Sequence, residues 1–112
     1  MVAICDPILT EAVTIAGASE YERIRTDLLA AYPWVPVPDR AWETVHSVQA
    51  RLAAKSQHHG LSVADHLVVA TALHHHLTIL HEDADFGTAA AVIPDIQQQR
   101  ILAAEDDADP RE

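Results

Sequence analysis

Apolar positions along the chain alternate between short continuous runs and stripes with helical spacing. Residues 2–5 (VAIC) and 77–80 (LTIL) are compact apolar runs, which are typical of buried β-strands. Elsewhere apolar residues recur every three or four positions, which predicts amphipathic helices over residues 7–16, 19–32, 39–55, 63–75 and 86–92. Strands that alternate with helices in this way indicate an α/β domain with a parallel sheet.

Polar residues with capping character mark the expected helix starts. Ser19 with Glu22 three positions later forms a capping-box pattern, Asp39 precedes the third helix, and Ser62 precedes the fourth. Residues 34–38 (WVPVP) are expected to be extended, and their prolines restrict them to an edge strand or a linker. A last short segment is expected from Pro94 to the start of the tail.

Length and composition are those of one small globular domain. The chain has 112 residues, of which 49% are apolar. We expect the domain to span residues 1–102 and to be followed by an acidic, disordered tail over residues 103–112. No apolar run approaches the roughly 20 residues that cross a bilayer, and Cys5 is the only cysteine. A cytoplasmic protein without a membrane span is therefore expected.

The formal net charge of -10 limits the kinds of nucleic-acid binding that are open to the chain. Non-specific binding depends on neutralising phosphates with basic side chains, which an acidic chain does poorly. Acidic side chains close to apolar elements can instead gather around a divalent cation. The charge is therefore compatible with a nuclease only if the site holds metal, and a basic protein partner is the other reading.

Four acidic residues are placed where a parallel sheet would bring them to one rim. Asp65 lies three residues after Ser62 in the first turn of an apolar helix, and Asp83 and Asp85 follow the second apolar run. If this segment is extended, these last two side chains point the same way. Glu11 lies on the helix after the first run. Ligands bind at such rims, although a first-turn acid also complements a helix dipole, and a D-x-D pair is common in solvated turns.

Other common metal sites fit the sequence poorly. The consecutive residues His74, His75 and His76 splay around a helix end, and no H-E-x-x-H pattern or second cysteine is present. A calcium-binding EF-hand loop that started at Asp83 would need Glu at its twelfth position, where the chain has Pro94. Carboxylates are therefore the favoured ligands.

Two segments resemble a known family. Residues 61–72 (LSVADHLVVATA) followed by residues 77–86 (LTILHEDADF) resemble the C-terminal half of PIN-domain ribonucleases, in particular the VapC-type toxins of bacterial toxin–antitoxin pairs. Residues 7–11 (PILTE) resemble the segment that carries the family's helix glutamate. The resemblance covers roughly residues 2–95 and implies a three-layer α/β/α domain with a central parallel sheet.

The resemblance also implies an activity. It implies a metal-dependent endoribonuclease that hydrolyses RNA phosphodiester bonds with Mg²⁺ or Mn²⁺. Matched by position, Glu11, Asp65 and Asp83 are the catalytic metal ligands and Asp85 is an auxiliary ligand. The partners implied are RNA, a cognate antitoxin protein and a second copy of the chain in a homodimer. The candidate RNA-contacting cations are Arg23, Arg25, Arg40, Arg51, Lys55 and Arg100.

One departure from the family pattern leaves two hypotheses open. The family begins with a central strand that carries a further essential aspartate, and this sequence starts after the corresponding point. We therefore expect an N-terminally truncated domain with unpaired strand edges. The chain is then either an active toxin-like ribonuclease or a catalytically inactive PIN remnant that binds an antitoxin-like partner or itself.

Overall fold

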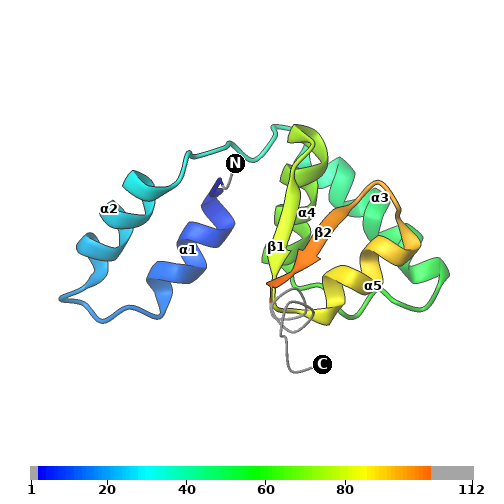
Figure 1. The fold of residues 1–112 in the computed structure, drawn as a ribbon. Coiled ribbons are helices and arrows are strands. Elements are labelled where there is room, and N and C mark those ends of the chain that lie inside the picture. The colour runs from blue at the N-terminus through cyan, green and yellow to red at the C-terminus, as the bar shows by residue number, and fades with distance from the viewer. Residues whose placement is uncertain (1–2, 102–112) are drawn as a thin grey trace, which may run out of the picture.

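The computed structural model describes residues 3–101 of the 112-residue chain, so the expected tail over residues 103–112 lies outside the described residues. The prediction of an α/β fold is confirmed (Figure 1). None of the described helices is both long and apolar enough to cross a bilayer. The elements in chain order are α1 (Asp6–Thr14), α2 (Tyr21–Ala31), α3 (Ala41–Ala54), α4 (Val63–His75), β1 (Thr78–His81), α5 (Ala84–Val92) and β2 (Gln97–Arg100).

The sheet of the described chain consists of β1 and β2 in parallel. Thr78 is opposite Gln97 and His81 is opposite Arg100. The sequence of β2, QQQR, has no apolar face, and three of its four residues are exposed. This strand is absent from the sequence prediction because an exposed polar edge strand leaves no hydrophobic period to detect. The second strand of the sheet is therefore known only from the structure.

The expected strand over residues 2–5 is reduced, within the described chain, to a single parallel bridge. Ile4 donates its N–H to the carbonyl of Pro33 at 2.8 Å and accepts from Val35 at 2.8 Å. The indole N–H of Trp34 donates to Asp6 at 2.8 Å, which ties the start of α1 to the same extended segment. Residues 34–38 thus act as the predicted extended connection.

The hydrophobic core lies on the side of β1 that α3, α4 and α5 cover (Figure 1). Its most deeply buried large side chains are Leu52, Val69 and Ile93, one from each of α3 and α4 and one from the end of α5. Phe86 anchors the first turn of α5 in the same core. Burying each side chain of this size contributes about 1.5–3 kcal/mol to the stability of the fold. The packed core therefore holds the end of β1 in place.

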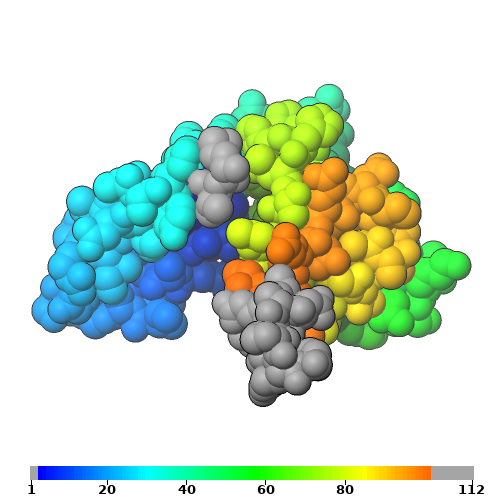
Figure 2. Space-filling view, in the orientation of Figure 1, coloured from blue at the N-terminus to red at the C-terminus, as the bar shows by residue number. Residues whose placement is uncertain are grey.

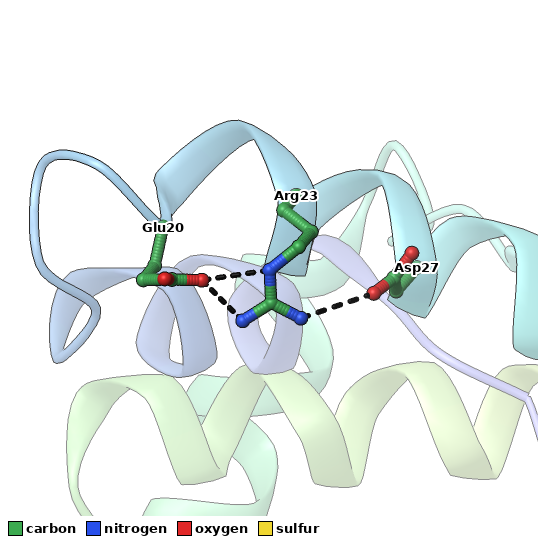
Figure 3. Close-up of polar contacts among 3 residues, drawn as sticks. All are labelled: Glu20, Arg23 and Asp27. Atoms are coloured by element: carbon green, nitrogen blue, oxygen red, sulfur yellow. Dashed lines mark hydrogen bonds and ion pairs between the residues drawn. The ribbon is translucent and has the colours of Figure 1, made fainter.

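Helices α1 and α2 pack against each other beside this core (Figure 1). Helix α2 begins without a side-chain cap, and its N-cap residue is Glu20. The predicted cap at Ser19 is wrong, because a turn closed by the N–H of Glu20 and the carbonyl of Gly17 at 2.9 Å contains Ser19. Figure 3 shows Arg23 reaching both Glu20 and Asp27 along the exposed face of α2. Exposed pairs of this kind add little stability.

The predicted cap at Asp39 is wrong for the same reason. The N–H of Ala41 donates to the carbonyl of Pro38 at 3.0 Å, so Asp39 lies inside a turn. The N-cap residue of α3 is Arg40, which makes no capping hydrogen bond through its side chain.

Candidate metal centre

Asp83 is the N-cap residue of α5 and lies two residues after β1 ends. Its Oδ1 accepts a 2.9 Å hydrogen bond from the backbone N–H of Asp85. Helix α5 begins at Ala84, so Asp85 is already in the first helical turn. The expectation that both aspartates project from one extended segment is therefore wrong. The local reason is that a carboxylate satisfies an N–H at the helix start that would otherwise lack a partner.

Asp65 is held by the predicted cap at the start of α4, which the structure confirms. The Asp65 N–H donates to the Ser62 hydroxyl at 3.1 Å, and one oxygen of the Asp65 carboxylate accepts from the Ser62 N–H at 3.3 Å. Asp83 is thus the N-cap residue of α5, whereas Asp65 is the third residue of α4 and closes the capping box with Ser62. In each, a backbone N–H orients the carboxylate and the helix dipole favours its negative charge.

The electrostatics show that three of the predicted acids lie close together. The pKa of Asp85 is raised, first by partial desolvation, then by the charge of Asp83 and a hydrogen bond with the Asp83 side chain, and finally by the charge of Asp65. Carboxylates that repel one another hold a proton more tightly unless a cation is present. This end of β1 is thus a place where positive charge is favoured.

The loop before α4 also lies close to one of these acids. A Cβ atom added to Gly60 would lie 2.7 Å from Oδ1 of Asp85, which is shorter than any normal contact. The loop before α4 therefore packs against the Asp85 carboxylate where residue 60 has no side chain, and a larger residue at this position would require that carboxylate or the loop to move. Gly60 is a site residue that the sequence reasoning missed, since a glycine in a loop is unremarkable without knowledge of its neighbour.

A groove of about 1190 Å³ lies between α1 and β1, and Asp65 and Asp83 are among the residues that line it. Figure 2 shows the α1–α2 unit and the β1–β2 unit on opposite sides of this hollow. Among the described residues, β1 has a strand partner on only one side. The lining is largely apolar and includes Ile4, Ile8, Ala12, Val68, Ile79 and Leu80. The expectation of an unpaired strand edge thus agrees with the described sheet.

Glu11 is the predicted acid that the structure does not bring to the others. It is exposed on α1, whose Ile8 and Ala12 form part of the opposite wall of the groove, and Glu11 is not a lining residue. Within residues 3–101, no three side chains of His, Cys, Asp or Glu are already arranged to hold a metal ion. Mg²⁺ commonly binds through only one or two carboxylates and keeps several waters. The oxygen donors of Asp65 and Asp83 therefore fit a hard divalent cation.

His81 is a second site residue that the sequence did not reveal. Its ring is almost fully buried, at 8% exposure, and lies next to Phe86 with ring centroids 4.9 Å apart. Nδ1 of His81 accepts from the backbone N–H of Asp83 at 3.0 Å, and Nε2 lies 2.6 Å from the side-chain oxygen of Gln98 on β2. Because β2 was not predicted, nothing in the sequence pointed to this contact.

His66 follows Asp65 in the chain but is turned into the protein. It is 4% exposed, and neither ring nitrogen has a hydrogen-bond partner in the described part of the chain. Burial lowers the pKa of His66, and the nearby charge of Asp65 opposes that shift only in part. Burial therefore favours the neutral form of His66 and keeps the ring away from the surface where a phosphate could approach.

Ion pairs divide the candidate RNA-contacting cations into two groups. Arg23 pairs with Glu20 and Asp27, and Arg40 pairs with Glu43. Within residues 3–101, the remaining candidates make no ion pair; they are Arg25, Arg51, Lys55 and Arg100.

Comparison with known proteins places this architecture in a family. The family model described as the PIN domain matches residues 2–92. The chain belongs to the PIN-domain family. Glu11, Asp65, Asp83 and Asp85 all lie inside the matched span of this PIN domain.

Several curated proteins of Mycobacterium tuberculosis are similar to this PIN-domain chain. Ribonuclease VapC6 is 37% identical over 103 residues, which cover 91% of this chain and 81% of the relative. Ribonuclease VapC17 is 33% identical over 97 residues, covering 85% and 72%. Ribonuclease VapC21 is 28% identical over 80 residues, covering 71% and 58%.

Proposed function

We propose that this PIN-domain chain is a metal-dependent endoribonuclease, the toxin component of a toxin–antitoxin pair. Asp65 and Asp83 are the proposed ligands of Mg²⁺ or Mn²⁺, and Asp85 supports them. Glu11, which is exposed on α1 and does not line the groove, is the fourth catalytic acid proposed from its place in the sequence. The observation that carries the proposal is the grouping of Asp65 and Asp83, which both line the groove, with Asp85, whose pKa is raised by the charges of both. The ribonuclease names of similar proteins support the same activity.

The reaction requires water to add across a phosphodiester bond. The water oxygen forms a new P–O bond, the ester P–O bond breaks, and the leaving oxygen takes up a proton. A divalent cation held by Asp65 and Asp83 would supply a water of lowered pKa and would neutralise charge on the reacting phosphate. Asp65 and Asp83 contribute fixed carboxylates, because each is oriented by a backbone N–H. Without the cation, the same acids repel RNA, so activity requires metal.

RNA cleavage tests this proposal directly. Purified chain incubated with Mn²⁺ should cut single-stranded RNA, and EDTA should stop the cut. Asp83→Asn should reduce cleavage to the level without metal, whereas Asp39→Asn, which changes an exposed acid in a turn before α3, should leave it unchanged. Cleavage that survives both EDTA and Asp83→Asn would contradict the proposal.

A second candidate function is a catalytically inactive module that binds a protein. The apolar groove beside the one-sided strand β1 favours it, since such an edge can accept an added strand from another chain. Leu80 on β1 and Ile8 on α1 both line this groove, with 47% and 39% of their surface exposed. Self-association through the groove, which gives the expected homodimer, is the simplest form of this function, and an antitoxin segment is the other.

Light scattering separates these functions when it is combined with the cleavage assay. An inactive module should show no Mn²⁺-dependent cleavage but should have the mass of a dimer, and Leu80→Glu should return it to a monomer. A monomeric, active wild-type chain would exclude the inactive self-associating module and leave the ribonuclease.

A further inference from the structure

We propose that His81 is a positioning residue that fixes Asp83 for metal binding and links it to Gln98 on β2; the inference rests on the proposed function. The three residues form a continuous chain of hydrogen bonds. Nδ1 of His81 accepts a hydrogen bond from the backbone N–H of Asp83 at 3.0 Å, and Nε2 of His81 lies 2.6 Å from the side-chain oxygen of Gln98. This series of hydrogen bonds begins at Gln98 on β2 and ends at Asp83, a proposed metal ligand.

The contacts define one tautomer of the ring. A backbone N–H can only donate, so Nδ1 of His81 must carry no proton. A neutral imidazole then has its proton on Nε2, where the oxygen of Gln98 can accept it. Both nitrogens are therefore used inside the protein. This arrangement excludes His81 as a metal ligand and leaves it an orienting role.

The position of the ring is itself well constrained. His81 is the last residue of β1 and lies opposite Arg100 in the parallel register. Phe86 packs on the ring at a centroid distance of 4.9 Å. A buried ring that is held by the strand on one side and by Phe86 on the other offers a fixed acceptor to the loop that carries Asp83.

The consequence for Asp83 follows from its two bonds. Its backbone is held by His81, and its carboxylate oxygen Oδ1 is held by the N–H of Asp85 at 2.9 Å. Without the hydrogen bond to His81, the backbone of Asp83 can move and the carboxylate is no longer oriented in one direction. The helix cap formed with the N–H of Asp85 can remain. Partners that orient metal ligands from outside the coordination shell typically change metal affinity by about 10–100-fold when they are removed.

Four variants test the role through the Mn²⁺ dissociation constant, measured by calorimetry. His81→Leu keeps the bulk but removes the acceptor, and should weaken Mn²⁺ binding by about 10-fold or more. His81→Asn restores an acceptor oxygen near the place of Nδ1 and should recover most of the affinity. Gln98→Leu, on the edge strand, should have an intermediate effect without threatening the fold. The exposed His74→Leu is the matched control and should match wild type.

An NMR readout that needs no metal accompanies the titration. The side-chain nitrogens of wild-type His81 should report the Nε2-protonated tautomer, and the amide of Asp83 should exchange faster with solvent in His81→Leu than in wild type. A folded His81→Leu variant that binds Mn²⁺ as tightly as wild type contradicts the positioning role alone. Failure of the wild-type chain to bind Mn²⁺ contradicts the proposed function, and the positioning role with it.

Discussion

The backbone N–H of Asp85 donates to a carboxylate oxygen of Asp83 at 2.9 Å, so the two acids of the D-x-D sequence are joined by a helix cap. Asp83 therefore has a structural role in α5 as well as its proposed role as a ligand. These two roles can be separated, because asparagine caps a helix about as well as aspartate but carries no charge.

Substitutions of Asp83 should separate capping from catalysis. Asp83→Asn and Asp83→Ala should both abolish Mn²⁺-dependent cleavage. Only Asp83→Ala should lower the free energy of unfolding, by about 1 kcal/mol, because alanine cannot accept the helix N–H. Urea denaturation monitored by circular dichroism measures the difference. Equal stability of the two variants would show that the cap contributes nothing.

The capping box of α4 gives a prediction with an internal control. Ser62→Ala removes the hydroxyl that accepts from Asp65 at 3.1 Å and should cost about 1 kcal/mol of unfolding free energy. Ser19→Ala should change stability by less than about 0.5 kcal/mol, because Ser19 lies in a turn and caps nothing. A larger loss for Ser19→Ala than for Ser62→Ala in the same denaturation experiment would contradict the assignment of the caps.

Gly60→Ala should disturb the acidic centre from the neighbouring loop. The new Cβ would lie 2.7 Å from Oδ1 of Asp85, so the carboxylate must move or the loop must retreat. We expect weaker Mn²⁺ binding and a shifted Asp85 carboxyl signal in NMR spectra. Gly87→Ala is the control, since nothing lies within 4 Å of its added Cβ, and this substitution within α5 should stabilise the helix by about 1 kcal/mol.

Burial of His66 predicts how stability depends on pH. Its pKa in the folded state is lowered below the ordinary value of 6.5, so on acidification the unfolded chain takes up a proton that the folded chain resists. This contribution to stability is complete above about pH 6.5 and is lost as the pH falls below that value. When the unfolding free energy is plotted against pH, His66→Leu should reduce the slope on the acid side. His74→Leu, which changes an exposed histidine, should keep that slope. An unchanged slope in His66→Leu would contradict the prediction.

The same substitution should also raise stability at neutral pH. A buried ring nitrogen without a partner costs roughly 1–3 kcal/mol, and leucine removes both nitrogens of His66. Part of that gain is lost to the difference in shape, so we expect a net increase of about 1 kcal/mol.

The elements that the sequence predicted correctly are those with strong and local signals. Ser62 directly precedes a long apolar helix and Asp65 lies in its first turn, and their reciprocal cap forms as the spacing indicates. Ser19 and Asp39 are also residue types that are preferred at N-cap positions, but each of them lies in a turn that precedes its helix. A capping pattern identifies a helix start only where no competing turn is available, and turn formation depends on backbone hydrogen bonds that residue types do not reveal.

The parts of the site that could not be predicted depend on contacts across the sheet. Gln98 comes from a strand with no apolar pattern, and His81 gains its role only when that strand pairs with β1. Gly60 matters because of Asp85, which is 25 positions away in the printed sequence. The clustering of Asp65 with Asp83 was expected from strand order, whereas the position of Glu11 relative to them depends on the α1–α2 unit across the groove.

Adding Mn²⁺ to ¹⁵N-labelled protein tests whether Asp65, Asp83 and Asp85 form one site for a divalent cation. Paramagnetic Mn²⁺ broadens the amide signals of nearby residues. We expect the signals of residues 65 and 83–85 to broaden first, the signal of Asp39 to stay sharp, and Asp83→Asn to remove the effect. Broadening confined to the acidic residues 105–112, or unchanged in Asp83→Asn, would contradict such a site.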